Sequence, residues 1–385
     1  MASSGGRNRL TTFFLLLSLL FTQTGCWGGR ELNARAFVTA IAFDLTKEEE
    51  LQSEQYLISI QLPVPERMAG GEGQGGGEGK PFVVLGSTAQ TVASGILQLQ
   101  RQLDRKLFLG HTRLILISKE VAETFGINHV IDYFLRDFSV QRMARLAVVD
   151  GKAREILELQ PPMGQTPSTY ILNMLSPQNG SIFTYLTDLG KFLVLQSDEG
   201  IFPVLPRLSK GKETELTGGA AVLRNGHFQG WLSDNETRGL NILHNEFVES
   251  EYEVECPLHP GDQIVVGVNA LHSAYRLEEA GGMPRIKVMV HGQFETREFT
   301  GPHGPEKHEE ADLERAVSAA IREEIQQTIK KAQELRVDVL GIGRYLLAHH
   351  PRFWAQLDWD TEFPFFPIEL EVKMDWGLTI RRLGG

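Results

Sequence analysis

The chain has 385 residues, and its 49 acidic residues outnumber its 38 Lys and Arg residues, which gives a formal charge of −11 at pH 7. Nucleic-acid phosphates and anionic membrane surfaces both attract clustered Lys and Arg, so this composition argues against direct binding to either. The length is sufficient for two or three domains with hydrophobic cores.

Residues 1–25 have the parts of a secretory signal peptide. Arg7 and Arg9 are basic, Leu10–Phe21 is a short apolar run, and small residues precede Cys26. The 12 residues of the run would span about 18 Å as a helix, less than the bilayer core of about 30 Å, so a permanent membrane-spanning helix is the weaker interpretation. No later stretch has 18 consecutive apolar residues.

Cys26 directly follows Thr24-Gly25 and resembles the lipobox cysteine of bacterial lipoproteins, which receives a diacylglyceryl group and becomes the new N-terminus. Gln23 stands where lipoboxes usually carry Leu or another aliphatic residue. We therefore predict diacylglycerol and palmitate on Cys26 and no other cofactor. An ordinary cleaved signal and a Cys26–Cys256 disulfide are the alternatives that the pattern leaves open.

The first 160 residues alternate predicted strands and helices. Ala36–Leu45 and Gln55–Val64 are rich in β-branched and aromatic residues and predict a hairpin. The glycine-rich Gly70–Lys80 predicts a loop, and Pro81 after Lys80 breaks the phosphate-loop pattern. Further strands are predicted at Val83–Leu85, Arg113–Ser118 and Ala144–Val149, and helices at Thr88–Gln102, Lys119–Phe125, His129–Arg136 and Ala153–Leu159.

Two breaker-rich segments divide the middle of the chain. Gln160–Ser168 contains three prolines, and Pro203 and Pro206 precede the polar run Ser209–Glu215. Between them, Thr169–Leu175 and Ile182–Gln196 predict helices. The predicted organisation is a signal peptide (1–25), an N-terminal region (26–205, with one lobe to about 150 and a second from about 160) and a C-terminal domain (215–385).

The C-terminal domain is predicted to contain a long amphipathic helix packed on a sheet. Asn225-Gly226 predicts a tight hairpin turn between Gly219–Arg224 and His227–Leu232, and Ser233–Leu243 a turn and short helix. The long helix, about Pro305–Val337, has an apolar stripe at four-residue spacing. Strands are predicted at Tyr252–Glu255, Gln263–Ala270, Arg285–Glu295, Phe366–Lys373 and Gly377–Arg381. The fold class is thus α/β in the mixed α+β sense, multi-lobed, with mixed or antiparallel sheets.

Catalytic and metal-binding motifs are absent from the sequence. It has no Gly-x-Ser-x-Gly elbow and no His-Glu-x-x-His. Leu346 stands where a dinucleotide turn starting at Gly341-Ile342-Gly343 needs its third glycine, so we interpret those glycines as a helix-to-helix turn. We predict no catalytic, metal or cofactor-binding residues and no enzymatic activity.

Four isolated residues have both a structural and a functional interpretation. His111 opens a core strand, where a structural hydrogen-bonding role is favoured over catalysis. Arg136-Asp137 is expected to close a helix end or form an ion pair rather than bind a ligand. Trp27, beside Cys26, suits either a membrane interface or packing on the first lobe.

Several short motifs, in this order, resemble those of the Ger(x)C family of spore germination lipoproteins, the C subunits of nutrient germinant receptors in endospore-forming bacteria. The match lies in five groups of residues, and Gly28 departs from it, because Asp is commoner at that position in the family. The five groups are Cys26-Trp27 with Arg30-Glu31; Gly110-His111; Arg136-Asp137 in Asp132–Asp137; Gly230 and Glu236 in Ala220–Thr237; and Asp338, Gly341 and Gly343 before His350-Pro351 and Trp354.

This resemblance implies a three-lobed α/β protein without a known catalytic centre. It implies lipid anchoring on the outer face of the spore inner membrane, and assembly with membrane-spanning A and B subunits into a receptor that promotes germination. The motif positions are expected to be structural. An exported solute-binding lipoprotein that captures a small nutrient between lobes, and an exported hydrolase, are the alternative functions.

Overall fold

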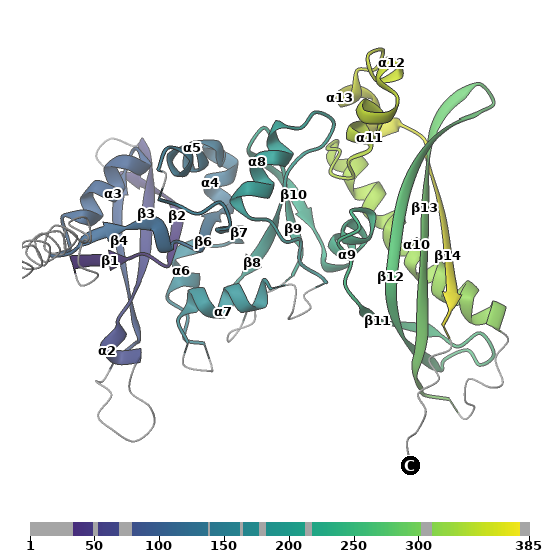
Figure 1. Ribbon diagram of the computed structural model, residues 1–385, viewed down its shortest axis with the longest axis horizontal. Helices are drawn as coiled ribbons and strands as arrows, with labels where there is room; N and C mark the ends of the chain where they lie inside the picture. Colours follow the sequence, from purple (N-terminus) through teal and green to yellow (C-terminus); the bar gives the residue numbers. More distant parts are fainter. Residues whose placement is uncertain are drawn as a thin grey trace, which may run out of the picture.

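An eight-stranded mixed sheet forms the first half of the molecule (Figure 1). The computed structural model describes residues 34–48, 53–68, 79–137, 139–161, 165–176, 182–211, 218–301 and 310–377. The signal peptide and the predicted site residues Cys26, Trp27, Arg30 and Glu31 lie outside the described residues.

Four parallel strands make the centre of this sheet, and an antiparallel pair extends it on each side. The strand order is β10-β9-β8-β7-β6-β2-β3-β4. The strands are β2 (Ala40–Glu48), β3 (Ser53–Pro63), β4 (Phe82–Ala89), β6 (Leu114–Ser118), β7 (Arg145–Asp150), β8 (Val204–Ser209), β9 (Ala220–Arg224) and β10 (His227–Leu232). A separate parallel pair joins β1 (Arg35–Phe37) to β5 (Lys106–Phe108).

Both predicted hairpins are confirmed. In the β2–β3 pair, Ile41 lies opposite Ile60. In the β9–β10 pair, Asn225 and Gly226 have φ angles of 53° and 82°, the left-handed conformation that a tight hairpin turn requires.

Helices cover both faces of the eight-stranded sheet, since its central strands are apolar on both sides. In β6, Leu114 and Leu116 belong to one core and Ile115 and Ile117 to the other. One face carries α3 (Val92–Gln100), α4 (Lys119–Thr124), α5 (Asn128–Arg136) and α8 (Leu189–Ser197), and the other α6 (Ala153–Leu157) and α7 (Pro167–Met174) (Figure 1). The short elements α2 (Pro65–Met68) and η2 (Leu109–His111) lie in connections.

The prediction of one helix over Ile182–Gln196 was wrong in its first half. The helix begins only at Leu189, with the Asp188 side chain accepting a hydrogen bond from the Lys191 N–H at 2.8 Å. The preceding residues run beside β7, because the Leu146 N–H donates to the Thr187 carbonyl at 3.1 Å. Hydrogen bonds to the sheet therefore replace those that a helix would have made.

The second half is a four-stranded sheet with one long helix against it (Figure 1). The sheet contains β11 (Ser250–Glu255), β12 (Gln263–Ala280), β13 (Met283–Phe299) and β14 (Ile368–Trp376). The helix is α10 (Glu310–Leu335), and its predicted stripe is confirmed, because Leu313, Val317, Ile321, Ile325 and Ile329 are all buried. Of the predicted last strand, only Gly377 is among the described residues.

The two halves meet through a shared hydrophobic core. The β9–β10 hairpin follows the predicted joint near 205–215, yet β9 pairs with β8 in the first sheet. One hydrophobic core contains Val204 and Val222 from that sheet and Leu240 from α9 (Asp234–Leu243), together with residues of the four-stranded sheet. The first sheet thus contains strands from both sides of the predicted joint, and the proposed domain limits stay predictions.

Three short helices and a 3-10 turn complete the second half. They are α11 (Ile342–His349), α12 (Pro351–Trp354), α13 (Trp359–Glu362) and η5 (Phe363–Phe365). They lie together beyond one end of α10, on the side of the molecule that faces α8 (Figure 1). Among the residues that the structure describes, no helix is long and apolar enough to cross a membrane.

Candidate functional site

A buried carboxylate organises the junction between the two halves. Asp338 follows α10, and its side chain accepts hydrogen bonds from the backbone N–H groups of Gly341 (2.9 Å) and Gly343 (2.7 Å). It also accepts from the Ile342 N–H at 3.4 Å and from the indole N–H of Trp359 at 2.9 Å. Gly341 has a φ of 77°, so the chain turns back and its amides converge on the carboxylate.

This turn is in direct contact with the first half. The Phe202 N–H donates to the Asp338 carbonyl at 3.0 Å, and the Arg344 N–H donates to the Gly200 carbonyl at 2.9 Å. A Cβ atom on Gly343 would lie 2.7 Å from the Gly200 Cα, closer than real side chains approach backbone. Glycine at position 343 therefore permits the two backbones to pack against one another.

A second buried group, His244, continues the polar junction. Its Nε2 lies 2.9 Å from the Val339 carbonyl oxygen, and its Nδ1 lies 2.8 Å from the Tyr185 hydroxyl. A carbonyl only accepts hydrogen bonds, so Nε2 carries the proton and Nδ1 accepts from Tyr185. Tyr275 adds a third contact, because its hydroxyl donates to the Leu340 carbonyl at 2.8 Å.

Burial shifts the pKa values of Asp338 and His244 toward their neutral forms. Loss of solvent raises the pKa of Asp338 to about 6, although its four hydrogen bonds act to lower it. Loss of solvent, with a smaller effect of the Lys191 charge, lowers the pKa of His244 to about 4. At neutral pH the junction thus holds an ionised carboxylate and a neutral imidazole.

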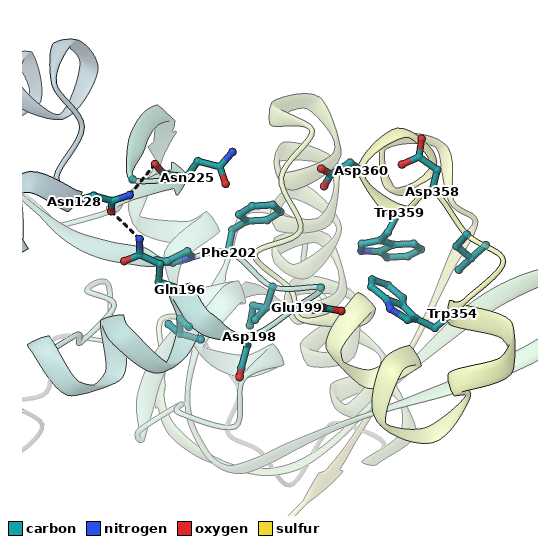
Figure 2. A pocket seen from close by; sticks show the side chains of 16 residues that line it. Asn128, Gln196, Asp198, Glu199, Phe202, Asn225, Trp354, Asp358, Trp359 and Asp360 are labelled. Carbon is teal, nitrogen blue, oxygen red and sulfur yellow. Dashed lines mark hydrogen bonds between the residues drawn. The ribbon is translucent and has the colours of Figure 1, made fainter. Parts of the chain in front are cut away.

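A cavity of about 480 Å³ opens beside this junction (Figure 2). Its walls come from the end of α8 and the following loop, the β9–β10 turn, and the α12–α13 region. Trp354 and Trp359 face one another on one wall, and Phe202 points toward them from the other half (Figure 2). Amides form the opposite wall, where Gln196 donates to Asn128 at 2.8 Å.

Two of the predicted motif residues position the α9–α10 region. Glu236 completes a capping box with Ser233 at the start of α9, and its carbonyl accepts from the Thr328 hydroxyl of α10 at 3.0 Å. Gly230 lies after a β-bulge in β10, where a Cβ atom would be 2.6 Å from a methyl group of Leu335. Both positions therefore bring α10 close to the first half.

The remaining described motif residues lie in the first half. The exposed His111 ring packs 4.7 Å from the Phe37 ring and 5.6 Å from the Phe108 ring, and a Cβ on Gly110 would meet Phe108. Arg136 pairs with Asp132 at 2.8 Å beside a second hollow of about 580 Å³. Asp137 ends α5 and accepts from the Ser139 N–H at 2.9 Å.

The structure thus brings together Asp338, Gly341 and Gly343 but leaves the first-half positions apart from them. The sequence did not predict their partners Gly200 and Trp359, nor His244, which contacts the neighbouring Val339 carbonyl. A hydrogen bond from Trp359 could have been predicted, since a buried indole N–H needs an acceptor, but the sequence did not reveal which group accepts it. In the described residues, no group of three or more His, Cys, Asp and Glu side chains is placed to hold a metal ion.

Comparison with known proteins assigns the chain to a class. Residues 28–210 match the family described as the spore germination protein N-terminal domain, and residues 218–384 match the family described as spore germination B3/GerAC like, C-terminal. The chain is therefore a spore germination protein of the GerAC-like family.

Particular relatives match it along almost their whole length. Spore germination protein KC of Bacillus subtilis (strain 168) is 24% identical, over 98% of this chain and 96% of the relative. Spore germination protein B3 of the same organism is 22% identical, over 97% and 96%. The crystal structure of the GerBC protein has a TM-score of 0.57 at 16% identity and covers 88% of this chain and 98% of that one, which shows a shared fold.

Proposed function

We propose that this protein is the lipid-anchored, non-enzymatic subunit of a nutrient germinant receptor that promotes spore germination. The observation that carries the proposal is the match of both halves to spore germination families, since together the two matches extend over residues 28–210 and 218–384. The comparisons favour a receptor component over a solute-binding lipoprotein, because the five relatives are all named as spore germination proteins, one of them as putative.

Attachment to the membrane is proposed to occur through Cys26. The basic start, the apolar run Leu10–Phe21 and the small residues before Cys26 have the order of a lipoprotein signal. Removal of residues 1–25 takes away Arg7 and Arg9 and no acidic residue, which leaves a charge of −13. Such a chain is repelled by anionic lipid surfaces, so an acyl anchor would supply the attachment that charge does not.

The partners that we propose are the A and B subunits, both with membrane-spanning segments, on the outer face of the spore inner membrane. The diacylglyceryl group proposed on Cys26 carries two acyl chains, which is enough for stable anchoring, and contact with integral membrane partners would then fix the protein's place within the membrane. The described residues provide a motif-bearing junction between two halves rather than a set of convergent catalytic groups. Scaffolding of other subunits is consistent with that arrangement.

Metabolic labelling with a palmitate analogue, followed by membrane fractionation, tests the anchor. Wild type is expected to be labelled and to sediment with membranes, whereas Cys26→Ala is expected to be unlabelled and largely released. Cys256→Ala is the matched control, because it removes the other cysteine and should retain both the label and the membrane location. Equal membrane retention of unlabelled Cys26→Ala would contradict attachment through this residue.

A further inference from the structure

We propose that the cavity beside the Asp338 junction binds a guanidinium group. The inference does not rest on the proposed function, because it concerns recognition by described residues and is tested without membranes or spores. At about 480 Å³ the cavity is within the size range of small-ligand sites, about 300–1,000 Å³, and it admits a guanidinium with the chain that carries it.

The first support is the aromatic wall. The Trp354 and Trp359 rings have centroids 5.9 Å apart at an angle of 54°, and both line the cavity. Trp359 is fixed by its hydrogen bond to Asp338 and is 6% exposed, with its ring packed against Trp354, so the half-buried Trp354 ring is the aromatic surface that a ligand would contact. Indole is the best side-chain partner for a cation over its face. A guanidinium, which is planar and weakly hydrated, stacks on such rings better than an ammonium does.

The second support is charge. The residues that line the cavity include Asp198, Glu199, Asp358 and Asp360 and no Lys or Arg. Two of these carboxylates form ion pairs with arginines that do not line the cavity: Asp360 with Arg224 at 2.8 Å, and Asp198 with Arg344 at 3.7 Å. Among the described residues, neither Glu199 nor Asp358 forms an ion pair. Asp358 accepts a hydrogen bond from the Thr361 hydroxyl at 2.8 Å, so Glu199 is the carboxylate of the cavity that is best placed to offset the charge of a bound cation.

Glu199 places a carboxylate close to the aromatic wall of the cavity. Its side chain extends from the loop after α8 toward Trp354 (Figure 2). Glu199 belongs to the first half of the molecule, and Trp354 and Asp358 belong to the second. A cation between them would contact both halves, and its charge would offset the mutual repulsion of acidic groups that converge from the two sides.

The guanidinium can come from a free small molecule or from an arginine of a partner protein. Calorimetric titration of the full chain with ethylguanidinium, and with its neutral isostere N-ethylurea, tests the shared chemistry. We expect ethylguanidinium to bind in the millimolar range and N-ethylurea to bind at least about tenfold more weakly, since the charge supplies the recognition.

A second pair of titrations separates the two sources. It uses the peptide acetyl-Gly-Arg-Gly-amide and the same peptide with citrulline in place of arginine. Binding of the arginine peptide at least about tenfold more tightly than ethylguanidinium would indicate an arginine presented by a protein. Equal binding of the two would indicate that a free guanidinium compound suffices. The proposal would be overturned if the urea and guanidinium members of each pair bound equally. It would also be overturned if no probe bound at roughly tens of millimolar, about 10-fold above the expected range.

Variants locate the binding in the cavity. Glu199→Gln and Trp354→Leu are each expected to weaken ethylguanidinium binding about three- to tenfold. Glu253→Gln removes an exposed carboxylate on β11, outside the cavity, and should leave binding unchanged. Thermal unfolding of each variant checks that the fold is intact. Unchanged binding in both cavity variants, with the fold retained, would also overturn the proposal.

Discussion

The indole N–H of Trp359 donates a 2.9 Å hydrogen bond to the carboxylate of Asp338, 21 residues earlier in the chain. Asp338 is 1% exposed and Trp359 is 6% exposed, so neither group exchanges this bond for water. The same carboxylate caps the turn that holds Gly343 against Gly200. Loss of the carboxylate would therefore affect α11, α13 and the contact between the two halves together.

Removal of this carboxylate is expected to destabilise the protein strongly. Asp338→Ala leaves the N–H groups of Gly341 and Gly343 and the Trp359 indole without an acceptor in a buried site. Each buried unsatisfied donor costs roughly 1–3 kcal/mol, so we expect a loss of about 3 kcal/mol or more in the free energy of unfolding. Chemical denaturation measures it, and Asp375→Ala, which truncates an exposed side chain on β14, is the control that should change little. A loss below about 1 kcal/mol would contradict the role given to Asp338.

The close approach of Gly343 to Gly200 predicts that a methyl group will not be tolerated there. We expect Gly343→Ala to lower the free energy of unfolding by about 2 kcal/mol, because overpacking of this size forces backbone shifts. Gly377→Ala is the matched control, since its Cβ would make only an ordinary 3.6 Å contact with the Phe294 carbonyl oxygen. Equal effects at the two positions would mean that the packing at Gly343 adjusts without cost.

The two shifted groups of the junction should have opposite effects on stability with pH. The pKa of Asp338 in the folded protein, about 6, is above its ordinary value of 3.8, so the folded state binds the proton more tightly. Its contribution to stability is therefore largest below pH 3.8 and decreases as pH rises to about 6. The pKa of His244, about 4, is below its ordinary 6.5, so the unfolded state binds that proton more tightly, and stability decreases as pH falls from 6.5 to 4.

Each shift corresponds to about 3 kcal/mol over its pH window, so the two contributions nearly cancel between pH 4 and 6. We expect His244→Gln, relative to wild type, to lose stability as pH rises through this window, because only the Asp338 contribution remains. Asp338→Asn should show the reverse slope relative to wild type. Urea denaturation at a series of pH values measures both differences. Parallel pH profiles for wild type and both variants would show that these groups do not titrate as stated.

The start of α9 offers a smaller and separate test. Ser233 and Glu236 form a capping box, in which the Ser233 N–H donates to the Glu236 carboxylate at 2.7 Å. Ser233→Ala should cost about 1 kcal/mol, the usual value for loss of a helix cap. The control is Ser197→Ala at the C-terminal end of α8. It removes a hydroxyl that donates only to the Val194 carbonyl one turn earlier, so it should be nearly neutral. Differential scanning calorimetry would detect the difference, and equal melting temperatures would argue against the cap.

Patterns that repeat along the chain were sufficient to predict much of the fold. The stripe from Leu313 to Ile329 predicted the buried face of α10, and Asn225-Gly226 predicted the β9–β10 turn, because both depend on neighbours in sequence. The Ile182–Gln196 error has the opposite cause. Its first residues have helical spacing, but their carbonyls accept hydrogen bonds from distant segments, as Thr187 does from Leu146 of β7 and Phe183 from Gly219, and these bonds replace those of a helix.

The candidate site was only partly predictable, because some of its residues are neighbours in sequence and others come from distant segments. Asp338, Gly341 and Gly343 were identified as a group, because they lie within six residues of one another. Their partners Gly200 and Trp359, and His244, which contacts the neighbouring Val339 carbonyl, come from three other segments, and none belongs to a motif that was recognised. The facing of Glu199 and Trp354 across the cavity depends on how the two halves pack, which no local pattern encodes.

We propose that the protein works as a membrane-bound receptor subunit with integral membrane partners. Purification of the tagged full chain from detergent-solubilised spore inner membranes, with mass spectrometry of the bound proteins, tests it most directly. We predict that two proteins with membrane-spanning segments co-purify with wild type in fixed proportion and are strongly depleted with Cys26→Ala. Recovery of the wild-type chain from the soluble fraction, without membrane partners, would contradict the claim.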